Sequence, residues 1–152
     1  MKLINLTLLL ILFVLTPAAY AGEANAQQTK NDVMAVLDEF IETFSAKDPA
    51  LHVATYHFPH FRLAQGEMSS WNTASEAAEM HKLIFKNLQN AGWDKSIWNK
   101  REIVNMSSSK VHVSTRFTRL RNDGSEIGSY NSLYILIKKN GRWAIKMRSS
   151  FL

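Results

Sequence analysis

Hydrophobic residues recur at two different spacings along the chain, and the spacing changes near residue 96. Between residues 31 and 46, apolar side chains return every three or four positions while acidic residues occupy the other side. This pattern predicts an amphipathic helix. Asp48 followed by Pro49 is typical of a helix start, with a capping side chain and then a proline in the first turn. We therefore expect a short second helix over residues 49–56.

The next segment predicts a hairpin and a third helix. Residues 57–71 alternate around the turn signal Gln65-Gly66, which favours two short paired strands. Thr73 with Glu76 three residues later is a capping box that opens a helix running to Asn90. Gly92 is expected to end this helix. The stripe expected to face the core consists of Ala77, Met80, Ile84 and Leu88.

From residue 96 onward the hydrophobic period is two, which predicts strands. The expected strands cover residues 97–106, 110–121, 127–138 and 142–151. Asp123-Gly124 and Asn140-Gly141 are strong signals for tight hairpin turns, and strands joined in this way are antiparallel. Three helices, a hairpin and a four-strand meander give an α+β domain whose helices cover one face of the sheet.

The first residues have the organisation of a secretory signal peptide. Lys2 supplies a positive charge, residues 3–15 are almost wholly apolar, Pro17 ends the run, and Ala19-Tyr20-Ala21 has the small-x-small form of a cleavage site. The alternative is a retained membrane anchor, but the apolar run is shorter than the roughly 20 residues that span a bilayer. We predict a signal peptide over residues 1–21.

Removal of residues 1–21 leaves a polar segment at 22–28 and one domain at 29–152. The chain has no cysteine, which excludes disulfides, thiol nucleophiles, thiolate metal sites and an acylated lipoprotein anchor. A domain of this kind is held by its own core, and a hydrophobic content of 46% is enough to build one. We expect a periplasmic or secreted protein with no stable membrane anchor after cleavage.

Charge is distributed unevenly along the chain. Residues 22–94 carry five Lys or Arg against ten Asp or Glu, whereas residues 95–152 carry 12 against three. A basic half can bind nucleic acid or anionic lipid. However, no basic block is longer than two residues, and export removes the protein from nucleic acid. We interpret the basic side chains as the solvent-exposed part of the sheet and expect no nucleic-acid partner.

The order of elements and several short segments resemble the nuclear transport factor 2-like superfamily, and its SnoaL-like polyketide-cyclase branch most closely. The matching segments are residues 40–44, 58–62, 117–119 with 123–124, and 140–145. The resemblance covers about residues 29 to 151. It implies a curved sheet wrapped around helices in a cone, a pocket that takes small apolar or aromatic ligands, and a homodimer formed through the outer sheet face.

Enzymes of this superfamily include ketosteroid isomerase, scytalone dehydratase and limonene epoxide hydrolase, but the resemblance does not extend to their catalytic groups. These enzymes use carboxylates that project from strands into the pocket. Here the acids after residue 95 are Glu102, Asp123 and Glu126, and the last two lie at a turn. Residues 60–64, where an isomerase base is expected, contain no acid. Fold alone does not select a function.

Histidine is the other candidate base, because its pKa lies near neutrality. His60, with Tyr56 nearby, is a candidate for proton transfer at the pocket mouth. The alternative is a loop histidine that caps a helix or faces water, because no acid adjacent in sequence orients it. His57 and His60 also suggest zinc, but catalytic zinc needs three protein ligands and a third is not evident. We predict no metal, and with no phosphate-binding loop we predict no cofactor.

Arginine and aromatic side chains complete the candidate ligand site. Arg62, Arg116 and Arg148 are flanked by apolar residues, and an arginine on the concave face of the sheet would hold a carboxylate or enolate oxygen. Alternation predicts that Val111, Val113, Thr115 and Phe117 face the helices, which places Arg116 outside unless a bulge intervenes. Trp71 adds an aromatic surface. The candidate ligand-binding residues are Tyr56, His60, Arg62, Trp71 and Arg116.

Three functions are compatible with these features. The first is an exported small-molecule-binding protein with an apolar cone-shaped pocket. The second is an isomerase, dehydratase or cyclase that uses His60 or Tyr56 as acid or base. The third is a protein-interaction module that acts through the outer sheet face. The sequence does not decide whether the protein is an enzyme.

Export predicts a defined mature N-terminus. Ala19-Tyr20-Ala21 follows the apolar run and its Pro17 break at a short distance, so we expect cleavage after Ala21 and a soluble product that begins at Gly22. Intact-mass analysis of the extracytoplasmic fraction measures this. A product that begins at Gln27 would move the site to Ala24-Asn25-Ala26, and a precursor mass in the membrane fraction would contradict export as a soluble protein.

Overall fold

A computed structural model describes residues 17–152. The elements run in the order α1 (Pro17–Ser45), α2 (Pro49–Ala54), β1 (Tyr56–Ala64), β2 (Glu67–Trp71), α3 (Ala74–Asn90), β3 (Lys95–Met106), β4 (Lys110–Leu120), β5 (Glu126–Lys139) and β6 (Arg142–Ser150). The predicted α+β class is confirmed, and the expected strands after residue 95 agree with the observed ones within two residues at each end.

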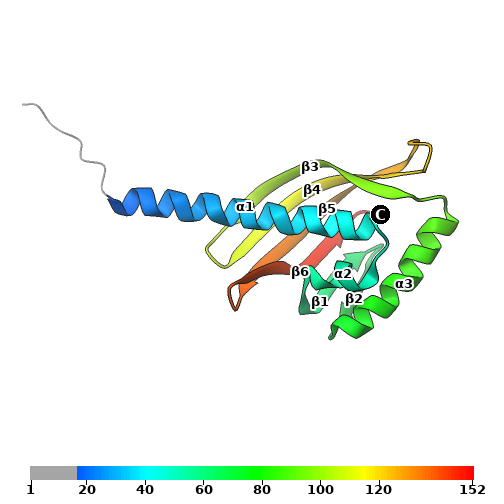
Figure 1. Ribbon diagram of the computed structural model, residues 1–152, viewed down its shortest axis with the longest axis horizontal. Coiled ribbons are helices and arrows are strands. Elements are labelled where there is room, and N and C mark those ends of the chain that lie inside the picture. Colours follow the sequence, from blue (N-terminus) through cyan, green and yellow to red (C-terminus); the bar gives the residue numbers. More distant parts are fainter. Residues whose placement is uncertain (1–16) are drawn as a thin grey trace, which may run out of the picture.

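The six strands form one curved mixed sheet in the order β2-β1-β6-β5-β4-β3, and α1 crosses one of its faces (Figure 1). Every neighbouring pair is antiparallel except β1 and β6, which are parallel. This pairing joins the early hairpin to the last strand of the meander. The sequence pattern did not predict it, because the partners lie more than 80 residues apart.

Helix α1 begins earlier than its apolar pattern indicates. The predicted helix covers residues 31–46, whereas the observed helix begins at Pro17. Residues 22–32 are exposed or half-exposed, so this part continues the helix without contacting the core, and its alanine, glutamine and glutamate residues have high helix propensity. The predicted signal peptide falls mainly on residues 1–16, outside the described part, and its cleavage stays a prediction.

The core lies between the buried face of α1 and the sheet. Val33, Leu37 and Phe40 of α1 pack with residues of β4, β5 and β6 in one hydrophobic cluster. A second, smaller cluster joins Phe44 to α3 and to Trp93. The predicted inward set of β4 is confirmed, since Val111, Val113, Thr115 and Phe117 are all buried. None of the helices within residues 17–152 is long and apolar enough to cross a membrane.

Helix α3 starts as predicted but presents a different face to the core. The Thr73 side chain accepts a hydrogen bond from the Glu76 amide, and the Glu76 carboxylate accepts one from the Asn72 amide. The predicted stripe is wrong at Met80, which is 41% exposed. The residues buried on this helix are Ala77, His81 and Phe85. A stripe chosen by hydrophobicity alone omits His81, which is buried with both ring nitrogens in hydrogen-bond contact with neighbouring groups.

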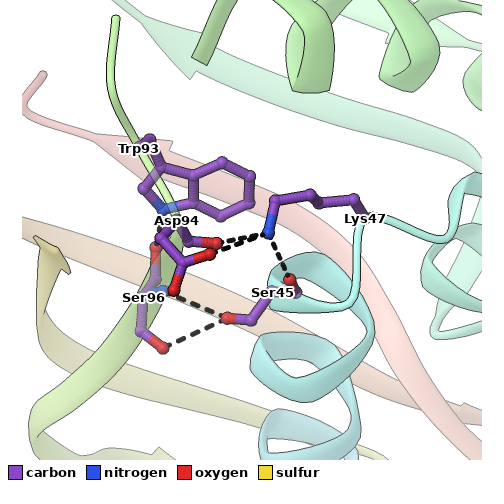
Figure 2. A network of polar contacts seen from close by, with 5 residues as sticks. All are labelled: Ser45, Lys47, Trp93, Asp94 and Ser96. Atoms are coloured by element: carbon purple, nitrogen blue, oxygen red, sulfur yellow. Dashed lines mark hydrogen bonds and ion pairs between the residues drawn. The ribbon is translucent and has the colours of Figure 1, made fainter. Parts of the chain in front are cut away.

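A polar network connects the end of α1 to the start of β3 (Figure 2). The Ser45 hydroxyl donates to the Ser96 carbonyl at 3.2 Å and accepts from the Ser96 amide at 3.1 Å. Lys47 donates to the Asp94 carbonyl at 2.6 Å, and its ammonium lies 5.0 Å from the centre of the Trp93 ring. The network holds the end of the helix against the edge of the sheet, beside the cavity described below.

The outer face of the sheet carries an apolar patch across three strands. Cross-strand register aligns Phe61 of β1 with Met147 of β6 and Ile135 of β5. Two residues further along, Leu63 of β1 and Leu133 of β5 both pair with Ser149 of β6. All five apolar side chains are half-buried in the single chain. Antiparallel sheets with one face on helices usually have a polar outer face. The patch is therefore the part of the surface that fits a protein contact.

Candidate functional site

One cavity opens between the helices and the concave face of the sheet. The space between its atoms is about 440 Å³, its opening to solvent included. Helices α1 and α3 and strands β1, β3, β4, β5 and β6 all contribute to its wall. The lining residues are Phe40, Ile41, Phe44, Arg62, Ile84, Ser96, Trp98, Phe117, Arg119, Tyr134, Arg148, Ser150 and Leu152. The wall is therefore apolar and aromatic, with three arginines among its polar groups.

The three arginines reach the cavity from three strands. Arg62 lies on β1, and Arg119 continues the inward alternation of β4 one step beyond Phe117. Arg148 reaches it because β6 carries a bulge. Ile145 pairs with Leu136 of β5, and Met147 pairs with Ile135, so the residue between them has no cross-strand partner. The extra residue reverses the alternation, so that Ile145 before it and Arg148 after it both face inward.

The arginines carry uncompensated positive charge. Arg148 is only 7% exposed, and Arg62 and Arg119 are half-buried. Burial, followed by the charge of Arg148, lowers the pKa of Arg62 to about 10, and burial lowers the pKa of Arg119. All three guanidinium groups remain charged at neutral pH. The four ion pairs within residues 17–152 involve other side chains.

Aromatic rings support two of these arginines. The guanidinium carbon of Arg148 lies 5.4 Å from the centre of the Phe40 ring, and that of Arg119 lies 5.1 Å from the ring of Tyr130. Cations stacked on aromatic faces gain a modest electrostatic attraction. The aromatic contacts hold the side chains against the wall, and the buried Nε atoms of Arg119 and Arg148 have no hydrogen-bond partner.

A buried cluster of histidine and tyrosine lies next to the cavity wall. The Tyr56 hydroxyl oxygen is 2.8 Å from His52 Nε2 and 3.2 Å from His81 Nε2. His81 Nδ1 donates to the Ala77 carbonyl at 2.7 Å, so its Nε2 accepts when the ring is neutral. When both contacts are hydrogen bonds, His52 Nε2 donates to Tyr56 and Tyr56 donates to His81. No net charge is needed.

Burial keeps these histidines neutral. It lowers the pKa of His81 to about 4 and that of His60 to about 3, and it also lowers the pKa of His52. The charge of Arg148 acts in the same direction on each of them. Burial also raises the pKa of the Tyr56 hydroxyl. At neutral pH the cluster is therefore a chain of neutral hydrogen bonds.

His60 belongs to the core rather than to a pocket mouth. Its ring is fully buried and stacks on Tyr56 with centroids 3.8 Å apart, and on Trp71 at 5.7 Å. Nδ1 lies 3.1 Å from the Ile145 carbonyl oxygen, and the buried Nε2 has no hydrogen-bond partner. The alternative interpretations, a helix cap or a histidine facing water, do not describe a ring enclosed in this way.

The structure separates the five predicted ligand-binding residues. Arg62 lines the cavity. Tyr56, His60 and Trp71 lie together in the core and are not part of the cavity lining, which corrects their expected place at its mouth. Arg116 is exposed on the outer face, as the alternation of β4 indicated. Phe40, 6.2 Å from Tyr56 between ring centroids, connects the buried cluster to the cavity.

The two histidines considered for zinc make separate contacts with β6. His57 Nε2 lies 3.1 Å from the Arg142 carbonyl oxygen, and His60 Nδ1 lies 3.1 Å from that of Ile145. Residues 17–152 contain no group of three side chains that could hold a metal ion.

Sequence reasoning missed Arg119 and left the face of Arg148 open. The signal for Arg119 was present, because the inward alternation from Val111 to Phe117 continues to it. The position of Arg148 had no such signal. Strict alternation from the inward-facing Ile145 would turn both Lys146 and Arg148 outward. Only the bulge in the register places Arg148 inside.

Comparison with known families identifies the class of protein. Residues 30–148 match the family model described as NTF2-like protein (DUF6841), and the chain belongs to this family. The predicted superfamily is confirmed, whereas the SnoaL-like branch stays a prediction. A search of the curated proteins finds no match to the sequence.

Solved structures with the same fold are distant in sequence. An NTF2-like protein with a cystatin-like fold from Novosphingobium aromaticivorans is similar with a TM-score of 0.76 and 8% identity over 91% of both chains. A ketosteroid isomerase-like protein from Erwinia carotovora atroseptica has a TM-score of 0.62 and 18% identity, over 80% of this chain and 93% of that one.

A third structure is hexachlorocyclohexane dehydrochlorinase LinA-type3 from Novosphingobium barchaimii. It has a TM-score of 0.66 and 9% identity over 84% of this chain and 88% of that one. At these identities the comparisons establish the fold and do not transfer a reaction or a substrate.

The buried histidines predict a loss of stability in mild acid. Their folded-state pKa values lie below the unfolded value near 6.5, so between about pH 6.5 and pH 4 the unfolded chain binds protons that the folded chain does not. The free energy of unfolding should be constant above pH 7 and fall as pH decreases. At pH 5 the loss is at most about 2 kcal/mol for each buried histidine. Denaturant titrations at several pH values measure it.

Removal of one buried histidine tests the source of this dependence. His81→Phe should reduce the slope between pH 7 and pH 5 by the contribution of one histidine. Leu83→Phe, on the exposed surface of the same helix, is the matched control and should keep the wild-type slope. An unchanged slope in His81→Phe would contradict the assignment.

Proposed function

We propose that this NTF2-like protein binds a small, largely apolar molecule in the cavity between α1 and the sheet. The observation that carries the proposal is the wall itself. It combines rings and aliphatic side chains from α1, α3, β3, β4 and β5, and β1 and β6 add arginines. Ligand sites of proteins are mostly apolar concavities with a few polar groups that orient the ligand.

Binding without catalysis fits the chemistry of the wall better than proton transfer does. No Asp, Glu or His occurs among the lining residues. The related structures include an isomerase-like protein and a dehydrochlorinase, and the corresponding reactions need a group that accepts a proton near the ligand. The catalytic alternative with His60 or Tyr56 would require these buried rings to become accessible from the cavity.

We also propose that the protein acts outside the cytoplasm, in the periplasm or as a secreted protein, and that it forms a homodimer. The features of residues 1–21 support export. The patch of Phe61, Leu63, Leu133, Ile135 and Met147 supports association of two copies through their outer sheet faces. The same patch is the surface that a different protein partner would use.

The cavity is tested with a neutral aromatic probe, 3-phenylpropan-1-ol. We expect saturable NMR shifts for residues of the cavity wall. Ile84 lines the cavity and its neighbour Leu83 is 57% exposed on the same helix. Ile84→Trp fills the space and should weaken binding at least tenfold, whereas the matched control Leu83→Trp should bind as the wild type does. Equal binding by both variants would contradict the proposal, and so would the absence of a saturable shift in the wild type both with this probe and with the corresponding acid, 3-phenylpropanoate.

The dimer is tested by a charge placed in the outer patch. Ile135→Glu introduces a carboxylate where two apolar faces would meet, and burial of an unpaired charge is costly. We expect the wild type to sediment at twice the mass of one chain and Ile135→Glu to sediment as a monomer. Leu83→Glu, on the exposed surface of α3, is the control and should remain dimeric. A wild-type monomer at high micromolar concentration would refute the dimer.

A further inference from the structure

We propose that the ligand is an organic acid, and that Arg62, Arg119 and Arg148 hold its carboxylate while its apolar body lies along the aromatic wall. This inference rests on the proposed function and specifies the ligand class for the same cavity. It starts from a property of the site that core packing does not explain, namely three cations without an anion.

The positive charge on the cavity wall is not compensated. Three guanidinium groups line one small cavity, and the described residues place no carboxylate within 4.0 Å of any of them. Positive charges that are close together and partly removed from water destabilise the free protein. Such a cluster of arginines is expected in a site that binds an anion, because the anion compensates the positive charge. The guanidinium groups are already in position, and this strengthens the binding of the anion.

The same arginines have hydrogen-bond donors without acceptors. The Nε atoms of Arg62, Arg119 and Arg148 are all buried and have no hydrogen-bond partner. Buried donors without partners are rare in folded proteins. A guanidinium group presents its N–H donors in a fixed planar fork that matches the two oxygens of a carboxylate. Three free donors on one wall therefore indicate an oxyanion as the missing acceptor.

The burial of the three arginines favours a carboxylate over a doubly charged head group. Arg148 is the one buried arginine of the three, at 7% exposure, and water reaches larger parts of Arg62 and Arg119. One negative charge therefore compensates the single guanidinium that solvent does not screen. The rest of the wall, with Phe40, Phe44 and Trp98, suits an aromatic or aliphatic body attached to that head group.

The experiment compares three probes that share one body: 3-phenylpropanoate, 3-phenylpropan-1-ol and 3-phenylpropylamine. Titrations followed by NMR at pH 7 and low salt give the three dissociation constants. We expect the acid to bind about ten- to a hundredfold more tightly than the alcohol, the amine not to bind measurably, and the advantage of the acid to shrink as salt is raised. Equal affinity for acid and alcohol would overturn the inference.

Single substitutions locate the head group. Arg119→Gln and Arg62→Gln should each weaken the acid about tenfold and leave the alcohol unchanged. Arg116→Gln, on the exposed outer face of the same strand as Arg119, is the matched control and should change neither. The thermal midpoint of the free Arg62→Gln variant should not fall below that of the wild type, because a like-charge repulsion is removed. Acid binding that is insensitive to both cavity substitutions would overturn the assignment.

The outcomes separate this inference from the proposed function. If neither acid nor alcohol binds, the proposed binding function itself fails. If both bind with the same affinity and Ile84→Trp abolishes both, the cavity binds ligands but the organic-acid inference is wrong. A preference for the acid that is lost in Arg119→Gln supports both.

Discussion

A single bulge in the last strand connects the core of this protein to its cavity. Before the bulge, Trp143 and Ile145 of β6 face inward and pack in the hydrophobic core. After it, Arg148 and Ser150 face inward and line the cavity. One residue without a cross-strand partner therefore changes the inner face of the strand from apolar to charged. Arg148 is near both the core and the cavity. Its charge lowers the pKa of the buried histidines and of Arg62.

The interior contains two sets of polar side chains, and they differ in whether their hydrogen bonds are satisfied within the protein. The cluster of His52, Tyr56 and His81 is satisfied internally, with a neutral chain of hydrogen bonds that ends on the Ala77 carbonyl. It needs no ligand and contributes specific packing. Arg62 and Arg148 belong to a group with neither compensating charge nor acceptors for their Nε atoms. Buried polar groups are normally paired, and the unpaired set beside the cavity is therefore the basis of the proposed ligand site.

The fold alone does not give the function of this protein. Structures of similar shape include an isomerase-like protein and a dehydrochlorinase. Here the concave wall carries guanidinium groups and rings, with no Asp, Glu or His among its lining residues. Function on a shared scaffold depends on the particular side chains of the site, and the proposed anion site rests on these side chains.

The sequence by itself determined the elements and the superfamily, because helix caps, turns and hydrophobic periods are local signals. It gave the strands after residue 95 and the inward face of β4, and with that face the outward position of Arg116. The tertiary structure alone decided the parallel pairing of β1 with β6, the burial of His60 and the inward direction of Arg148. These depend on register between distant strands, where a shift of one residue moves a side chain to the opposite face, and no local pattern records such a shift.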